Sequence, residues 1–460
     1  DQMLASVSIP EEFASIWIPE RIQEGLQRQG VVGIDTEILP EVTQHPDVLY
    51  PVATGKEPES GKDAEVVDEL GLTEVAGKPT ERSDRSVNMK ELNFIKNVNQ
   101  GQVLMRKNPV QPGVPGVNVF GEPIPCREGE DVEFPSIPNA ELSEDGYSLV
   151  STINGCAYKE GNQLHLVSTF EVQKNVDYSI GNIDASVAVH VNGDVLTGFR
   201  VESREDIIVK GTTEGCHLLS RGNIFLPGGV QGKEEAIIRA KKNVDAKFFN
   251  EANVTAGGAV IVHGAVILSR IRCQRLALEG NDAVIKGGEI EAAIDVCADS
   301  IGSDIGSKTK ITLGHDLREL EDKLETLAED IQNAGDRLQR FEESRENLRK
   351  MQEKNGYLPP DKEKLKEKVE SSLAQAQERL EEKETNREKK QIELENARQI
   401  VRTVRVRKKI MPGVEIDILG HSISFKTPTD PVTVIVIDDE IQVVPFQERS
   451  FEEADEMDIE

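Results

Sequence analysis

The sequence predicts a mainly β protein that carries one long helical insertion. Three observations support this fold class. Short aliphatic segments recur every 16–20 residues in the middle of the chain, a coiled-coil pattern follows them, and aromatic residues make up only 4% of the 460 residues. A parallel β-solenoid and a helical hairpin both build their cores from Val, Ile, Leu and Ala, so together they account for the shortage of aromatic side chains.

The first 170 residues predict two small modules. Residues 1–80 read as an α/β module, in which Pro19 suits the first turn of a short helix and Gly30 its end. Residues 81–170 contain short strands separated by Pro and Gly, most densely over residues 109–125. This second segment predicts a compact β module.

The strongest internal signal is a repeat between residues 186 and 292. Six consecutive blocks each open with a short aliphatic strand, and in most of them a Gly follows before a second aliphatic pair, as at Gly193 and Gly264. Such units cannot bury an apolar face alone, but stacked coils bury a continuous aliphatic column. We therefore expect a parallel β-helix over residues 171–315, rather than an antiparallel β domain with Gly-rich turns.

Residues 316–409 predict a projecting antiparallel coiled-coil hairpin. The segment holds equal numbers of acidic and basic residues, and its apolar residues recur at alternating spacings of three and four over two stretches, 317–351 and 365–404. Gly356 suits the end of the first helix and Pro360 the approach to the second. Because the link between the helices is so short, they must run antiparallel.

Aliphatic strands return after the hairpin. Residues 410–447 predict a returning β segment, so the hairpin is inserted in, or attached to, the end of the β structure. Residues 448–460 are strongly acidic and predict a disordered tail. Polar residues at Lys383 and Arg387 interrupt the apolar pattern and predict a weaker middle of the second helix.

Charge and cysteine content limit the class of function. A net charge of -29, from 83 acidic and 54 basic residues, argues against a general binder of nucleic acid or of anionic membranes. No apolar stretch approaches the ~20 residues of a transmembrane helix. The five cysteines are widely spaced, without a CxxC pair or a nearby His at metal-ligand spacing. We therefore expect no disulfide framework, no metal and no cofactor, and a reducing cytoplasm is the simplest setting.

The sequence offers no candidate catalytic residue. His190, His217 and His263 have no Ser, Cys or paired carboxylate at a recognisable spacing. The Gly-rich segments 226–235 and 257–264 match neither a phosphate loop nor a dinucleotide-binding turn, so we expect them to be structural turns.

Two groups of residues are candidate partner-binding sites. Tyr357 and Leu358 are apolar residues at the predicted hairpin tip, where they either contact a partner or pack against a neighbouring element. A basic run lies where residues 397–414 contain no acid, and it includes Arg402, Arg405, Arg407, Lys408 and Lys409. This run either binds an acidic partner or complements the helix C-terminus and the acidic body of the protein. We favour the internal explanation.

Several segments resemble the flagellar assembly protein A family of bacteria. The segments are GVVGIDTEI (30–38), PVATGKEPESGKDAEV (51–66), NPVQPGVPGVNVFGEPIP (108–125), NVDYSIGNIDAS (175–186), NGDVLTGFRVES (192–203), EDIIVKGTTEG (205–215), GGEIEAAIDVCADSIGSDIGSKTKITLG (287–314) and MPGVEIDILG (411–420). The resemblance covers nearly the whole chain except the acidic tail. At Ser203-Arg204-Glu205 and Cys273-Gln274-Arg275 the chain departs from the expected Gly-Gly turns, so those corners should be less regular.

The resemblance implies a right-handed parallel β-helix in a non-enzymatic cytoplasmic protein. It also implies a role in flagellar assembly or in the organisation of the cell pole, through contacts with protein partners. It supplies no catalytic residues, and the oligomeric state, including a homo-oligomer, stays open.

Two enzymatic alternatives remain. An acyltransferase on a left-handed β-helix would have a strict six-residue register, which holds from Val189 to Ile207 and fails at Thr213. A polysaccharide-active enzyme on a right-handed β-helix would carry clustered Asp and basic groups in a groove, and no such cluster is visible. The leading prediction is therefore a scaffold for protein partners.

Overall fold

The computed structural model describes residues 2–72, 80–81, 87–88, 90–92, 94–161 and 163–446, with only the backbone of residues 80–81 and 87–88. The predicted acidic tail, residues 448–460, lies outside the described residues. The chain forms two compact units: Asp1–Lys78 with Asn93–Ser168, and Pro79–Leu92 with Thr169–Glu460.

The first unit contains two separate apolar cores. In the first core, β1 pairs antiparallel with β2, and the predicted helix α1 begins at Pro19, whose ring suits the first helical turn. Leu39, Val42 and Val52 lie at its centre, together with Val119 from the Pro- and Gly-rich segment. The elements are β1 (Leu4–Val7), η1 (Glu11–Phe13), α1 (Pro19–Arg28), α2 (Leu39–Gln44) and β2 (Tyr50–Thr54).

The second core of this unit lies between two antiparallel sheets of strand order β10-β11-β7-β3 and β13-β12-β6. Leu104, Leu149 and Leu166 are buried in it. The strands, with the separate pair β8 and β9, are β3 (Glu65–Asp68), β6 (Ile95–Val98), β7 (Val103–Asn108), β8 (Gly116–Val117), β9 (Pro123–Ile124), β10 (Ala140–Leu142), β11 (Ser148–Ser151), β12 (Gly155–Glu160) and β13 (Gln163–Val167).

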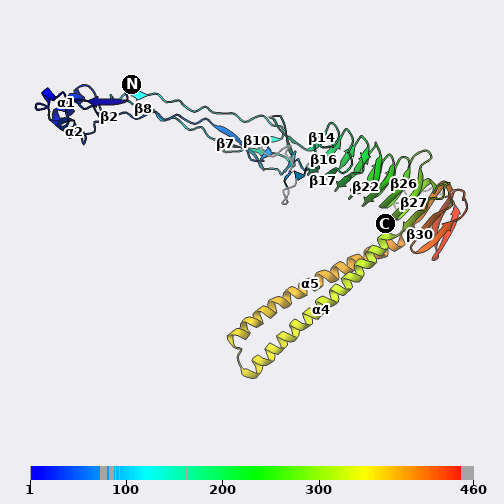
Figure 1. Ribbon diagram of the computed structural model, residues 1–460. Coiled ribbons are helices and arrows are strands. Elements are labelled where there is room, and N and C mark those ends of the chain that lie inside the picture. Colours follow the sequence, from blue (N-terminus) through cyan, green and yellow to red (C-terminus); the bar gives the residue numbers. More distant parts are fainter. Residues whose placement is uncertain are drawn as a thin grey trace. The chain divides into compact units, whose positions relative to one another are not determined.

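The second unit contains the predicted parallel β-solenoid, whose strands stack coil upon coil (Figure 1). A small antiparallel pair, β4 (Thr80–Glu81) and β5 (Val87–Asn88), precedes it. The solenoid strands are β14 (Thr169–Val172), β15 (Ile183–Ala185), β16 (Ala188–Val191), β17 (Arg200–Ser203), β18 (Ile207–Val209), β19 (Thr213–Glu214), β20 (His217–Ser220), β21 (Ile224–Leu226), β22 (Val230–Ala240), β23 (Val244–Ala246), β24 (Phe249–Ala256), β25 (Ala259–Val262), β26 (Val266–Leu278), β27 (Val284–Ile301), β28 (Thr309–Leu313), β29 (Thr403–Ile410) and β30 (Val414–Ile418).

Three mainly aliphatic columns fill the solenoid, one behind each face. Their members are aligned from coil to coil, and each is at most 6% exposed. The first column is Phe170, Val189, Ile207, Ile224, Val244, Val260, Leu276, Val296 and Val404. The second is Ile183, Val201, Leu218, Ile238, Val254, Ile271, Ile290, Ile311 and Ile416. The third is Val176, Val195, Thr213, Val230, Phe249, Val266, Ile285, Ile301 and Ile410.

Polar side chains satisfy the backbone at the corners between coils. The Asp206 carboxylate accepts a hydrogen bond from the Asn223 backbone N–H at 2.7 Å, and the Asn223 and Asn243 side-chain oxygens accept from the next coil in the same way. The corner at Ser203 lacks a Gly pair, and there the Ser203 hydroxyl accepts from the Glu205 N–H at 3.0 Å. Hydrogen bonds from side chains therefore stabilise turns that Gly would otherwise form.

The helical hairpin is inserted at one corner of the solenoid. In one preceding coil, the two faces that meet at this corner are connected by Gln274 alone, and in the following coil they are connected by Ala293-Ile294. In the next coil the same connection consists of residues 314–402. Within this insertion lie α4 (His315–Asn355) and α5 (Pro360–Gln399). The helices are antiparallel, because Glu321 pairs with Arg398 and Asp330 with Lys383. The solenoid then continues in register.

The predicted C-terminal limit of the hairpin, residue 409, is wrong. Helix α5 ends at Gln399, and Thr403–Ile410 form β29, which pairs in parallel with β27. Val401 and Val404 continue the helical spacing of apolar residues by coincidence. The alternation of Val404, Arg405 and Val406 is the pattern that the sheet selects, because one side of β29 faces the apolar core.

An antiparallel cap ends the solenoid. Strands β31 (His421–Phe425) and β32 (Val432–Ile437) pair with β30 and β29, and β33 (Glu440–Pro445) pairs with β32. The turn between β32 and β33 is at Asp438 and Asp439, and both have positive φ values, of 51° and 62°.

Candidate functional site

Arg402 organises the point at which the hairpin is inserted. Its side chain is only 1% exposed, and its guanidinium bonds to three parts of the structure. Nε donates to the Ala293 carbonyl of the solenoid at 2.9 Å, and Nη1 donates to the carbonyls of Ala397 and Ile400 at the end of α5. Nη2 donates to the Asp316 carboxylate in the first turn of α4 at 3.0 Å. One buried cation therefore joins both helices to the solenoid, with its donors satisfied.

Further contacts hold the base of the hairpin. Leu317, Leu394 and Ala397 form a small buried cluster at the base of the two helices. Outside this cluster, Arg272 of the solenoid pairs with Glu319 of α4, and Arg318 lies 3.5 Å from Asp417 of β30. The base is thus fixed to coils that precede and follow the insertion.

Arg405, next in the predicted basic run, is buried against the solenoid. Its Nε lies 3.2 Å from an oxygen of Asp295, which also accepts a hydrogen bond from the Thr403 hydroxyl at 2.7 Å. Burial by itself lowers the pKa of Arg405, but the hydrogen bond and charge of Asp295 outweigh it and raise that pKa. The side chain is therefore held as a cation inside the protein.

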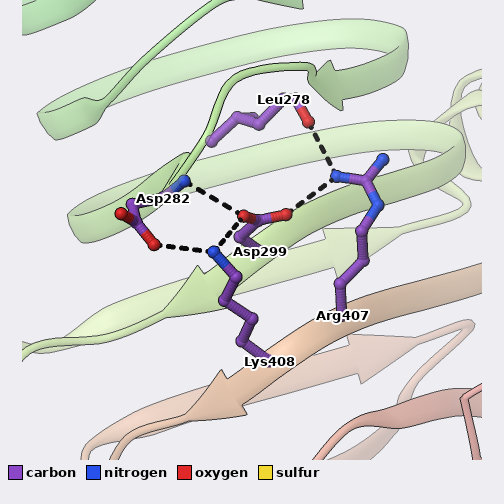
Figure 2. Close-up of polar contacts among 5 residues, drawn as sticks. All are labelled: Leu278, Asp282, Asp299, Arg407 and Lys408. Atoms are coloured by element: carbon purple, nitrogen blue, oxygen red, sulfur yellow. Dashed lines mark hydrogen bonds and ion pairs between the residues drawn. The ribbon is translucent and has the colours of Figure 1, made fainter.

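Arg407 and Lys408 converge on Asp299, which is almost fully buried (Figure 2). Arg407 donates to the Leu278 carbonyl at 3.0 Å and to Asp299 at 3.1 Å. Lys408 lies 2.8 Å from Asp299 and 2.6 Å from Asp282. Burial raises the pKa of Asp299, but the hydrogen bonds from Lys408 and Arg407 outweigh it, so the net shift of this pKa is downward.

These contacts favour the internal explanation of the basic run. Arg402, Arg405, Arg407 and Lys408 each pair with a carboxylate of their own chain, and the first two are buried. Lys409 is exposed and has no ion pair within the described residues. Partner binding through Lys408 or Lys409 stays a prediction.

The hairpin tip presents apolar side chains to solvent. Tyr357 is 67% exposed and Leu358 is half-buried, in the turn that follows Gly356. Gly356 has a φ of 73°, the left-handed conformation that ends α4. The tip and the basic run lie at opposite ends of the hairpin, so the predicted site residues form two sites rather than one.

The structure also shows contacts that sequence reasoning missed. Nε2 of His263 lies 3.1 Å from Asp245 on the exposed surface of the solenoid. One coil is 16 residues here, which places Ile261 directly beside Asp245 and His263 two positions further along the chain, so the repeat length could have indicated their proximity. The acidic partners Asp282, Asp295, Asp299 and Asp316 carry no such signal, because their spacing from the basic run includes the whole hairpin.

Metal sites, reactive thiols and membrane-spanning helices each place structural requirements on the described residues. Within the described ranges, no group of three or more His, Cys, Asp and Glu side chains is placed to hold a metal ion. Burial raises the pKa of Cys216 to about 12, so its thiol stays protonated. None of the helices in the described part of the chain combines the length and hydropathy needed to cross a membrane.

Two family models match the chain. The model described as "Flagellar Assembly Protein A beta solenoid domain" matches residues 168–441, and the model described as "Flagellar Assembly Protein A N-terminal region" matches residues 1–162. No match was found among curated proteins or among solved structures.

Proposed function

This chain belongs to the flagellar assembly protein A family, and on that premise we propose that it is a non-enzymatic scaffold. In this proposal the protein acts in the cytoplasm in flagellar assembly or in the organisation of the cell pole, by holding protein partners. The observation that carries the proposal is the insertion of a long hairpin into a solenoid that continues in register on both sides of it.

The rigid attachment of the hairpin base supports a role in which the hairpin is held in a fixed orientation for a partner to bind. A hairpin attached by a flexible linker would sample many orientations, and a partner would then have to order it at a cost in conformational entropy. Here Arg402 bonds to α4, α5 and the solenoid at once. The hairpin is therefore preorganised at its base, as a binding arm should be.

The enzymatic alternatives gain no support from the described residues. The solenoid interior is filled mainly by aliphatic side chains, and burial raises the pKa of the Cys216, Cys273 and Cys297 thiols. Calorimetry with acetyl-CoA and with oligouronides tests these alternatives directly, and tight binding of either ligand would overturn the scaffold proposal.

A hairpin deletion tests the scaffold role. The preceding coil connects the same two faces with Ala293-Ile294, so we replace residues 314–402 by Ala-Ile. The matched control is Arg398→Ala in the intact chain, which removes an exposed ion pair and keeps the hairpin. Both variants replace the natural protein in its own bacterium.

We expect the deletion variant to fold, with the circular dichroism of a β-solenoid, and to lose normal flagellar number or position. The control should retain both. Normal flagella in cells that contain the folded deletion variant would contradict the proposal.

A further inference from the structure

The distal end of the hairpin differs in charge from the rest of the chain. Residues 345–368 contain more basic than acidic residues, although the whole chain has a net charge of -29. Two of the acids, Glu346 and Glu353, are already paired with Arg349, at 3.9 Å and 3.1 Å. In the described part of the chain no ion pair neutralises the exposed lysines Lys354, Lys362 and Lys364.

Apolar side chains are exposed among these lysines. Tyr357 is 67% exposed, Leu365 is 42% exposed and Met351 is 41% exposed. They lie in the last turns of α4, in the connecting turn and in the first turns of α5. Because a hairpin tip is convex, these side chains protrude rather than line a groove.

We propose that this tip binds the surface of a membrane that contains anionic phospholipid. Tyr357 enters the headgroup region, where an aromatic ring with a polar hydroxyl is favoured, and Lys354, Lys362 and Lys364 contact the phosphates. This inference rests on the proposed function of the hairpin as a binding arm. It names the surface to which the arm binds.

The small, convex tip favours a membrane over a protein groove. A stable protein interface buries roughly 1,000 Å² or more, which a single helical turn and its flanking residues do not easily supply. Binding to a bilayer has no such threshold, because each apolar or basic residue adds to the affinity.

The acidic body of the protein should be repelled by an anionic membrane, but the hairpin is long enough to place its tip beyond the reach of that charge. With 41 residues in α4, the tip lies about 60 Å along the helix from the insertion point. Charges are screened over ~8 Å at physiological ionic strength. The net charge of -29 therefore argues against membrane binding by the body, but it does not apply to the tip.

Vesicle binding by the full chain tests the proposal. Vesicles of phosphatidylethanolamine with phosphatidylglycerol are compared with vesicles of phosphatidylcholine alone, by co-sedimentation at low and high salt. The tip variant carries Lys354→Glu, Lys362→Glu and Lys364→Glu. The control carries Arg379→Glu, Arg387→Glu and Lys389→Glu, an equal change of charge at exposed positions in the middle of α5. Circular dichroism confirms that both variants fold.

Fluorescence reports where the tip lies. Trp17 is the only tryptophan, so the pair Trp17→Phe and Tyr357→Trp places a single reporter at the tip. We expect its emission to shift to the blue on anionic vesicles, and the tip variant to lose binding about tenfold or more while the control binds like the natural chain.

Equal binding by the tip variant and the control would overturn the proposal, as would unchanged emission or absence of binding to anionic vesicles. The two proposals can fail separately. If the hairpin deletion abolishes normal flagella but the tip variant binds vesicles as well as the control does, the scaffold function is supported and membrane binding by the tip is overturned. If the tip variant still binds vesicles but no longer binds an acidic protein that the natural chain binds, the membrane proposal is also overturned.

Discussion

The solenoid and the hairpin both rely on aliphatic side chains, but they bury them to very different depths. In the solenoid, three columns of aligned side chains are almost fully enclosed. In α4 and α5, the described side chains that are buried are Leu317, Leu348, Val369, Leu373, Leu394 and Ala397. Each solenoid coil packs on two neighbours and on its own opposite faces, whereas each helix packs on one partner.

The hairpin therefore has buried side chains near its base and in its distal half, but only its base is joined to the solenoid. Between these two groups of buried residues, Lys383 takes part in an exposed ion pair with Asp330. Exposed ion pairs contribute little to stability. This difference implies that the solenoid supplies global stability, while the hairpin is stabilised by its buried side chains and by the attachment of its base to the solenoid.

A core truncation should have the largest effect. Phe249 is fully buried in the third column, and Phe249→Ala should lower the free energy of unfolding of the second unit by about 3–5 kcal/mol. The matched control is Phe225→Ala, in which the ring is 37% exposed and the cost should be clearly smaller. Denaturant unfolding followed by circular dichroism measures both. Equal costs would refute the idea of a tightly packed interior.

Loss of the Arg402 cation at the hairpin base should have the second-largest effect on stability. Arg402→Met leaves Asp316 and three carbonyls without their donor, at a cost of about 2–4 kcal/mol, because Asp316 is partly hydrated. Hydrogen exchange should accelerate at the start of α4 and the end of α5 and remain slow in the solenoid. Arg398→Met, which removes an exposed pair with Glu321, should change neither by much. Uniform acceleration in all coils would show that Arg402 does not act locally.

The same contrast explains which features were predictable from the sequence. The solenoid repeat is local and periodic, so the segments around Val189, Ile207 and Val260 revealed it, and the pairing of the strands confirmed it. The hairpin was visible from its apolar spacing for the same reason. Its C-terminal boundary was not, because Val401 and Val404 fit a helix as well as a strand, and only pairing with β27 selects the strand.

The internal role of the basic run was harder to predict for a different reason. Arg402, Arg405 and Arg407 pair with acids that lie 86 to 110 residues earlier in the sequence. Neither spacing nor periodicity indicates such partners. Asp295 and Asp299 become neighbours of the basic run only when β29 stacks on β27, and Asp316 only when the hairpin folds back on itself, so the ion pairs are a consequence of the fold.

One polar residue interrupts the third column and gives a smaller, opposite effect. Thr213 is fully buried, and its hydroxyl has no hydrogen-bond partner. Thr213→Val keeps the shape of the side chain and should raise the free energy of unfolding by about 1 kcal/mol. The reciprocal change one coil later, Val230→Thr, should lower it by about 1–3 kcal/mol. A loss of stability in Thr213→Val would indicate that the hydroxyl contributes a favourable interaction to the core.

The smallest effect should appear as a difference in pH dependence at the coil that follows the hairpin. The folded pKa of Asp299 is lowered, so its contribution to stability is complete above its unfolded pKa of about 3.9 and is lost as the pH falls through the folded value. Asp299→Asn should therefore melt below the natural protein at neutral pH, and the gap should narrow on acidification. Asp282→Asn, at a carboxylate that is 88% exposed, leaves the Asp299 pairs with Arg407 and Lys408 intact and should preserve the acid sensitivity of the natural protein. If the difference in Tm between Asp299→Asn and the natural protein stays constant between neutral and acidic pH, the ion pairs of Asp299 do not stabilise this coil. Packing of the aliphatic columns alone then holds it in place.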